Sequence, residues 1–254
     1  MNNFELVVSD DVPATFLEKV NEFANASLGS SQALFLTGGS QAKLCYPALG
    51  KAFEGPQSSL ANIDLYLGDE RVVPLDSGFS NTALIDGLLG AQFKNLTNKN
   101  IHSPTRVAGF DLEGLMALGK SLPKHLAPSA HAQLRELTAG FSRSLAASPS
   151  SRLVHLGLGP DGHVASIFPK YTDFGIHTGD AATTLDLSGL NPFLRLSVSM
   201  EFINSSELVI LGATGSDKGE VLRKVLLDPD RYPAGRIQAA KFVILVDRDA
   251  AAKL

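Results

Sequence analysis

The sequence predicts an α/β fold with a mainly parallel sheet that is covered by helices on both faces. Short apolar strands alternate with helical stretches along the chain, as they do in parallel sheets joined by crossover helices. The expected strands are residues 4–8, 33–36, 63–67, 153–156, 194–198, 208–211 and 242–246. Three of them end in glycine and polar residues, and ligands bind at the carboxyl ends of such strands. We therefore expect a functional site where these three strand ends meet.

The segments between the strands contain the helices that this fold requires. Residues 12–28 carry apolar side chains at helical spacing, and residues 218–227 also favour a helix. Residues 111–149, rich in alanine, leucine and serine, predict one or two further helices. Because the chain has no internal repeat, low-complexity tract or linker, we expect one domain spanning residues 1–254.

Composition excludes several classes of protein. The 254 residues are 44% hydrophobic and 19% charged, which is ordinary for a globular protein. A net charge of −4 and a pI near 5.9 argue against binding to nucleic acid or to acidic membrane surfaces. The sequence shows no secretory signal and no apolar stretch long enough to cross a bilayer, so a cytoplasmic location is expected. Cys45 is the single cysteine, which excludes an intrachain disulfide and a cysteine-based zinc site.

The first strand end carries Gly38-Gly39-Ser40 before a predicted helix. Backbone N–H groups at such a turn and helix start can hold a phosphate. The alternative is a tight turn in which Ser40 merely caps the helix. The segment also comes within one residue of the nucleophile elbow of serine esterases, but it follows too few strands for that fold.

The second strand end carries Asp69-Glu70-Arg71, two carboxylates and a guanidinium. The fixed fork of donors in Arg71 suits an anionic oxygen. The alternative is a solvated cluster of surface charges. Arg195 and Lys218 are further cations that such a site can recruit.

The third strand end carries Asp161-Gly162-His163, a tight turn that presents an imidazole. Histidine titrates near neutral pH and can take a proton from water, so His163 is a candidate general base. The remaining histidines have no motif around them, and we interpret them as structural: His102, His125, His131, His155 and His177.

The same segment, Gly157 to Gly162, also matches the dinucleotide-binding fingerprint, which would make the protein an oxidoreductase. Pro169 ends any helix soon after the match, and no second strand places an acidic residue about 20 residues further on. These features argue against that alternative.

Together, in order and across nearly the whole chain, the motifs resemble the 6-phosphogluconolactonase family. The matching segments are 36–40, 68–74 with 80–81, 156–169, 195–200, 214–218, 233–236 and 246–251. The resemblance implies a three-layer αβα sandwich, shared with glucosamine-6-phosphate deaminases and ribose-5-phosphate isomerases. The deaminases carry Asp-Glu-Tyr in place of Asp69-Glu70-Arg71 and Ala-Phe-Asn-Glu-Pro in place of residues 165–169, so both differences favour a lactonase. A non-catalytic sugar-phosphate sensor is a further alternative.

The chain departs from the family in two places. Gln41-Ala42 stands where Thr-Pro usually follows the glycine turn, which affects the expected phosphate contacts. Residues 106–150 match poorly, and no functional residue is transferred there.

The implied reaction is hydrolysis of 6-phospho-D-glucono-1,5-lactone to 6-phosphogluconate in the oxidative pentose phosphate pathway, without metal or cofactor. The implied partner is this small sugar-phosphate lactone, and the expected assembly is a monomer or small homo-oligomer. His163 would be the general base, oriented by Asp161 or Asp69. Backbone N–H groups from Gly159 to Gly162, with Arg71, would stabilise the oxyanion. Gly38, Gly39 and Ser40 would hold the phosphate, with Arg195 and Lys218 as counter-charges.

Overall fold

Six parallel strands form the main sheet of the computed structural model, which describes residues 3–26, 30–53, 59–95, 101–104, 128–172, 177–186 and 193–254. Their order across the sheet is β1 (Glu5–Val8), β11 (Lys241–Val246), β10 (Leu208–Ala213), β5 (Ser151–Gly157), β2 (Gln32–Leu36) and β3 (Ile63–Leu67). The register is continuous, since Val154 at the centre lies opposite both Phe35 and Val209. The predicted parallel sheet is therefore confirmed.

Side chains alternate strictly between the two faces of this sheet. In β5, Leu153 joins one apolar cluster, whereas Val154 and Leu156 join the other. The same alternation occurs in β2, β10 and β11. Because both faces are buried, the strands read as continuous apolar runs in the sequence. The three-layer arrangement is confirmed.

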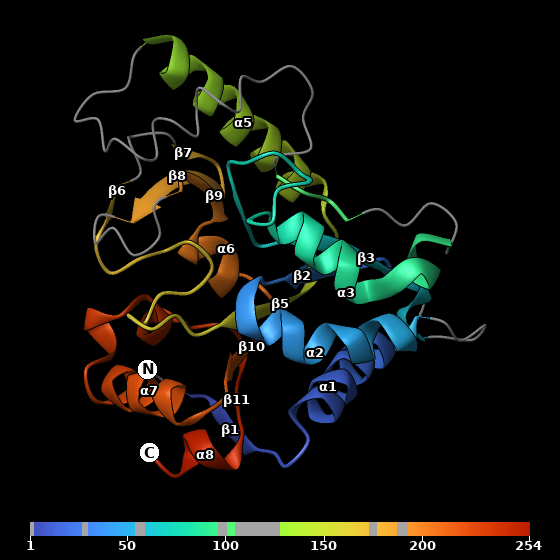
Figure 1. The fold of residues 1–254 in the computed structure, drawn as a ribbon, viewed down its shortest axis with the longest axis vertical. Helices are drawn as coiled ribbons and strands as arrows, with labels where there is room; N and C mark the ends of the chain where they lie inside the picture. The colour runs from blue at the N-terminus through green and yellow to red at the C-terminus, as the bar shows by residue number, and fades with distance from the viewer. Residues whose placement is uncertain are drawn as a thin grey trace.

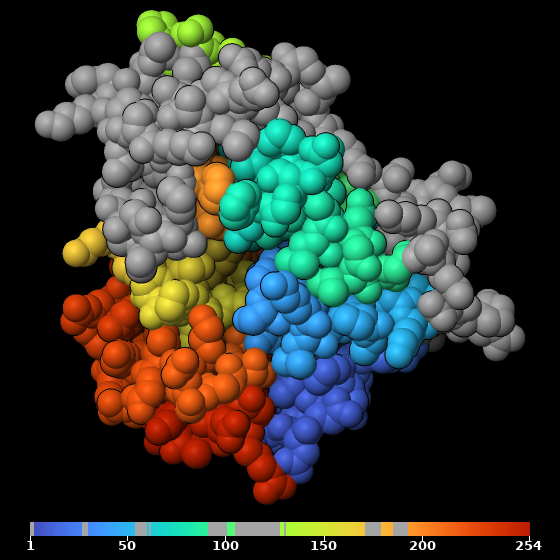
Figure 2. Space-filling view, in the orientation of Figure 1, coloured from blue at the N-terminus to red at the C-terminus, as the bar shows by residue number. Residues whose placement is uncertain are grey.

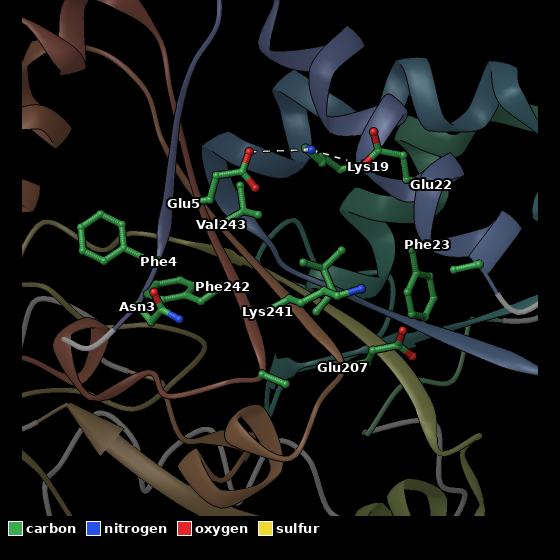
Figure 3. Close-up of a pocket in the computed structure, with 13 residues that line it drawn as sticks. Asn3, Phe4, Glu5, Lys19, Glu22, Phe23, Glu207, Lys241, Phe242 and Val243 are labelled. Carbon is green, nitrogen blue, oxygen red and sulfur yellow. Dashed lines mark hydrogen bonds and ion pairs between the residues drawn. The ribbon is translucent and has the colours of Figure 1, made fainter.

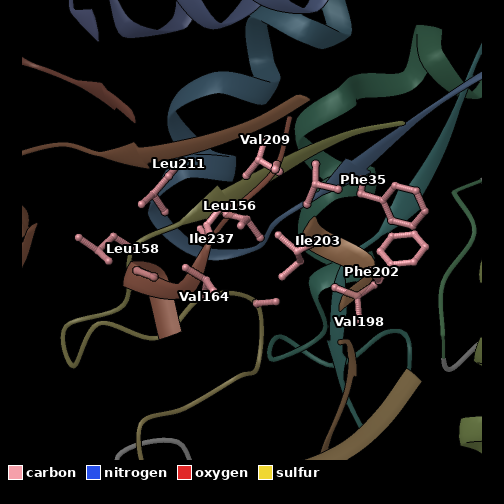
Figure 4. Close-up of a cluster of buried hydrophobic side chains, with 14 of the residues drawn as sticks. Phe35, Leu156, Leu158, Val164, Val198, Phe202, Ile203, Val209, Leu211 and Ile237 are labelled. Carbon is pink, nitrogen blue, oxygen red and sulfur yellow. The ribbon is translucent and has the colours of Figure 1, made fainter. Parts of the chain in front are cut away.

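Helices cover each face of the sheet (Figure 1). One face packs against α1 (Val12–Ala26), α2 (Gly39–Ala52) and α3 (Asn81–Asn95), which contribute buried side chains such as Phe16 and Tyr46. The other face packs against α6 (Met200–Asn204), α7 (Ser216–Leu227) and α8 (Arg248–Ala251). Figure 4 shows Phe202 and Ile203 of α6 beside the strand residues of that second cluster.

A second, antiparallel sheet stands next to the carboxyl end of β3. Its strands are β4 (Asp69–Arg71), β9 (Arg195–Val198), β8 (Ala181–Asp186) and β6 (Tyr171–Thr172), and β7 (His177–Thr178) pairs with β8. The sequence predicted the strand at 194–198 but not this sheet. Only Gly68 separates β4 from β3, which is too short for a crossover into the parallel sheet. The pairing of β4 with β9 places Arg71 directly opposite Arg195.

The remaining elements are short or lie at the edge. Three 3₁₀ turns cover Ser59–Asn62, Pro229–Arg231 and Pro233–Arg236. Helix α5 (Pro128–Ala147) packs against β8 and confirms the later part of the predicted helical region. The earlier part, from residue 111, lies outside the described residues. Among the helices that are described, none is long and apolar enough to cross a lipid bilayer.

Candidate active site

A cavity of about 160 Å³ opens at the carboxyl ends of the parallel strands. In Figure 2, the yellow surface after β5, the light-blue surface of α2, the teal surface after β3 and the orange surface near α7 meet on this face. The structure brings most of the predicted site residues together around the cavity: Gly38, Gly39, Ser40, Asp69, Arg71, Gly159, His163, Arg195 and Lys218. Asp161 and Gly162 belong to the same loop as His163. The expectation that distant loops converge is therefore met.

His163 and Asp161 form a close pair in the loop that follows β5. Nδ1 of the imidazole lies 2.5 Å from Oδ1 of Asp161, and the backbone N–H of His163 donates to the same oxygen at 3.2 Å. Burial alone would raise the pKa of Asp161, but these hydrogen bonds outweigh it and hold the pKa below its ordinary value. A carboxylate at Nδ1 favours the neutral tautomer in which Nδ1 carries the proton. The other ring nitrogen, Nε2, is then a proton acceptor.

The glycines of this loop shape the site sterically. A Cβ at Gly159 would lie 2.1 Å from Nδ1 of His163, and Gly162 has a φ of +82° that favours glycine. The N–H of Gly159 donates to the carbonyl of His163, and that of Gly162 donates to the carbonyl of Gly159. The turn itself already uses these two N–H groups, which argues against the role at an oxyanion that the sequence predicted for them.

Asp69 lies in the cavity wall but contacts other partners than the imidazole. Its carboxylate accepts a hydrogen bond from the Ser166 hydroxyl at 2.5 Å and lies 3.7 Å from Nη1 of Arg195. Arg195 is itself buried, and its charge is balanced by Asp69. This geometry favours Asp161 as the residue that orients His163. It makes Arg195 a weaker counter-charge for a phosphate than the sequence predicted.

Arg71 reaches the cavity from the end of β4. Its Nη1 donates to the carbonyl of Phe79 at 2.7 Å, and its backbone N–H donates to Glu70. Its Nε is buried and, among the described residues, has no hydrogen-bond partner. Burying an unsatisfied donor is unfavourable, and a ligand atom that accepted from this nitrogen would remove that cost.

The amino end of α2 faces the cavity without a cap. Gly38 occupies the N-cap position, and in the described part of the chain no side-chain cap hydrogen bond is made there. The alternative in which Ser40 caps the helix is therefore wrong. Gly39 adopts a φ of +71°, a left-handed conformation that favours glycine. Uncapped N–H groups and the helix dipole together favour an anion here.

A buried pair supports this turn from behind. The N–H of Thr37 donates to the Tyr46 hydroxyl at 2.8 Å, and that hydroxyl lies 3.0 Å from Nδ1 of His155. Burial lowers the pKa of His155 to about 3, so the ring is neutral and its Nδ1 accepts a hydrogen bond from the Tyr46 hydroxyl. The structural interpretation of His155 fits this placement.

Gln41, the departure from the family pattern, points inward. Its amide donates to the Thr214 hydroxyl at 3.0 Å, and its side chain packs against Gly157 and Gly212. It lies outside the lining of the cavity. The substitution therefore changes how α2 packs on the sheet rather than what faces a ligand.

Lys218 supplies a cation from the first turn of α7. Its ammonium donates to the carbonyl of Leu158 at 2.7 Å. Burial lowers its pKa, and the charges of Asp161 and Asp217 offset part of that effect. Because its hydrogen-bond acceptor is a neutral carbonyl and not a carboxylate, the ammonium group keeps its positive charge available to an anionic ligand.

A larger cavity of about 380 Å³ lies at the opposite, amino ends of the strands (Figure 3). Its Lys19 lies 3.9 Å from Glu5 and 3.2 Å from Glu22. Glu207 and Lys241 add one charge of each sign. With this lining the cavity is a poor site for an anion. Among the described residues, no group of histidine, cysteine, aspartate and glutamate side chains is arranged to hold a metal ion.

An uncapped helix end, two cations and an imidazole–carboxylate pair lie together at the carboxyl edge of a parallel sheet, which is a lining that suits a small anion. A family model described as glucosamine-6-phosphate isomerases/6-phosphogluconolactonase matches residues 8–245. The chain belongs to this family.

The relatives differ in how much of their own length this chain covers. The chain is 30% identical over 236 residues to a 6-phosphogluconolactonase of Bos taurus, covering 90% of this chain and 83% of that protein. It is 29% identical over 251 residues to the human GDH/6PGL endoplasmic bifunctional protein, covering 96% of this chain. The chain spans 28% of the length of that bifunctional protein.

Solved structures share the fold. The 6-phosphogluconolactonase of Trypanosoma cruzi superposes with a TM-score of 0.77 at 21% identity, covering 99% of this chain and 97% of that one. A monomeric glucosamine-6-phosphate deaminase superposes with a TM-score of 0.69 at 18% identity, covering 99% of this chain and 100% of that one. The fold alone therefore does not separate the two activities.

Proposed function

We propose that this protein hydrolyses 6-phospho-D-glucono-1,5-lactone to 6-phosphogluconate. The observation that carries the proposal is the His163–Asp161 pair, 2.5 Å apart, beside an uncapped helix end in one cavity. A base next to an anion site suits a phosphorylated ester. Membership of the family and relatives named 6-phosphogluconolactonase give the same answer.

The phosphate binds at the amino end of α2. Its oxygens accept from the first-turn N–H groups after Gly38, and the ammonium of Lys218 supplies positive charge from α7. These groups are preorganised, since Tyr46 fixes the turn and the Leu158 carbonyl fixes the lysine. Holding the phosphate fixes where the lactone carbonyl lies, which lowers the entropic cost of the reaction.

His163 activates the attacking water. Nδ1–H donates to Asp161, so Nε2 takes a proton from water as its oxygen attacks the lactone carbonyl carbon. When the tetrahedral intermediate collapses, the bond to the ring oxygen breaks. The imidazolium returns the proton to that oxygen, which leaves a hydroxyl and a carboxyl group. Asp161 stabilises the imidazolium between the two steps.

Arg71 stabilises the oxyanion. The carbonyl oxygen gains negative charge during the attack, and a fixed donor at that position is worth about 10²–10³-fold in rate. The Nε of Arg71, which is buried and has no hydrogen-bond partner among the residues that the structure describes, suits this role. Asp69 and Arg195 form the wall of the cavity through their ion pair.

The deaminase activity of the same family is the second candidate. The structure places Arg71 in the cavity, at the position where the deaminases carry tyrosine. A cation there suits a developing oxyanion and disfavours the ammonium group of an amino sugar. This observation favours the lactone.

Purified protein tests the proposal directly. Lactone hydrolysis is expected well above the spontaneous rate, and ammonia release from glucosamine 6-phosphate is expected to be absent. Hydrolysis no faster than in buffer would refute the lactonase proposal, and ammonia release would replace it. Binding of a sugar phosphate without turnover would indicate a sensor. The single domain, cytoplasmic location and small assembly stay predictions from the sequence.

A further inference from the structure

Asn81, the first residue of α3, faces the cavity with an unused acceptor. Its side chain is 2% exposed and lines the cavity. The amide Nδ2 donates to the carbonyl of Asp69 at 3.1 Å, which fixes the orientation of the amide. Oδ1 is buried, and no group in the described part of the chain donates to it.

The position of Asn81 is fixed by a buried carboxylate. Glu70 is fully buried, and its Oε1 accepts from the backbone N–H of Asn81 at 2.7 Å and from that of Arg71 at 2.8 Å. Its other oxygen accepts from the backbone and hydroxyl of Thr82. One carboxylate thus sets the backbone of two residues that line the cavity.

The amide oxygen lies directly against the phosphate-binding turn. A Cβ at Gly38 would come within 2.1 Å of Oδ1 of Asn81. Glycine at this position therefore leaves the oxygen room beside the place where we expect the ligand phosphate.

A donor on the ligand can satisfy this oxygen. A phosphate dianion and a lactone carbonyl both accept hydrogen bonds, and they match the N–H groups of α2, Lys218 and Arg71. The ring hydroxyls of a sugar lactone are donors. A buried acceptor without a partner is unfavourable in the free protein, and pairing with a hydroxyl removes that cost.

We propose that Oδ1 of Asn81 accepts a hydrogen bond from a ring hydroxyl of the sugar-phosphate lactone and so determines which sugar the enzyme accepts. This inference rests on the proposed function, whose site it refines. It differs from the roles of His163 and Arg71, which act on the reacting carbonyl.

The test compares lactones that each lack one ring hydroxyl, at C2, C3 or C4, with the intact lactone. In the wild-type protein, loss of the recognised hydroxyl is expected to lower kcat/KM by about tenfold or more. In Asn81→Ala, the same loss is expected to cost less than about threefold, because the acceptor is already gone. Asn81→Asp keeps an acceptor oxygen and is expected to retain the discrimination at a lower overall kcat/KM.

Gln41→Ala is the matched control. Gln41 is also a buried amide, 2% exposed, but its amide bonds to Thr214 and lies outside the lining of the cavity. Its loss of kcat/KM, whatever the size, is expected to be the same for every lactone. Thermal unfolding shows whether each variant is folded. If Asn81→Ala is not, Asn81→Leu replaces it, because leucine has nearly the shape of asparagine and also lacks the acceptor.

A uniform loss in Asn81→Ala across all the lactones would overturn the inference and indicate that the amide positions water or structure instead. An inactive wild-type protein would refute the proposed function itself. The two failures are therefore distinguishable.

Discussion

At the amino ends of the strands, Lys19 lies between two glutamates in a cavity of about 380 Å³, whereas at the carboxyl ends a cavity of about 160 Å³ holds Arg71 and Lys218. In the larger cavity, Lys19 is paired with carboxylates of the protein itself. Within the described residues, the smaller one has an uncapped helix end and a guanidinium nitrogen without a hydrogen-bond partner. It also has an imidazole whose Nδ1 is bonded to Asp161. Donors and acceptors that have no protein partner among the described residues, rather than volume, therefore distinguish the proposed site.

Replacing the base is expected to have the largest effect. His163→Ala removes the acceptor for the water proton, so kcat for the lactone should fall by about 10²–10⁴-fold. The assay follows hydrolysis against the spontaneous rate, with thermal unfolding as the control for folding. Near wild-type turnover in this variant would exclude His163 as the base.

Arg71→Gln should have the next largest effect. Loss of the charged donor at the oxyanion is expected to lower kcat by about 10²–10³-fold with a smaller change in KM. Steady-state kinetics separate the two constants. A rise in KM with kcat unchanged would assign Arg71 to the phosphate instead.

A pair of lysine variants compares the two cavities. Lys218→Gln removes a cation from the proposed phosphate site, and KM is expected to rise about tenfold. Lys19→Gln removes the paired cation at the other end, and kcat/KM is expected to stay at the wild-type value. If Lys19→Gln raised KM as much as Lys218→Gln, the assignment of the two cavities would be wrong.

His155, which lies within β5, offers a prediction about stability rather than activity. The folded pKa of His155 is about 3, below its ordinary value of about 6.5, so its contribution to stability is complete above pH 6.5 and declines as the pH falls toward 3. Between pH 7 and pH 5 this amounts to about 2 kcal/mol in the free energy of unfolding. Urea unfolding of His155→Phe should show a pH dependence smaller by that amount. An unchanged pH dependence would show that His155 is not buried in neutral form.

Strand and helix positions were largely predictable from the sequence. The strand at 63–67 matches β3 at both ends, and the helix at 218–227 lies within α7. The alternation of apolar strands with helical stretches and the glycine turns are local patterns, so they can be recognised in the sequence alone. The antiparallel sheet was missed because β4 is three residues long, and its pairing with β9 depends on contacts remote in the sequence.

Site residues were predictable where a motif carried them. Strand ends identified Gly38, Arg71 and His163, because the parallel topology brings such ends together. The ion pairs of these residues were not predictable. Asp69 and Arg195 look like unpaired charges in the sequence, but they pair with each other in the structure. Asn81 lies in a segment that matches the family, but the sequence gives it no role, because an unsatisfied oxygen is visible only once its surroundings are known.

The orientation of bound 6-phosphogluconate tests the central claim most directly. A crystal structure of the complex should place the phosphate against the first-turn N–H groups of α2 and Nζ of Lys218. The carboxylate formed from the lactone carbonyl should lie about 3 Å from Nε2 of His163. Product bound with its phosphate at His163, or in the cavity at the amino ends of the strands, would contradict the account.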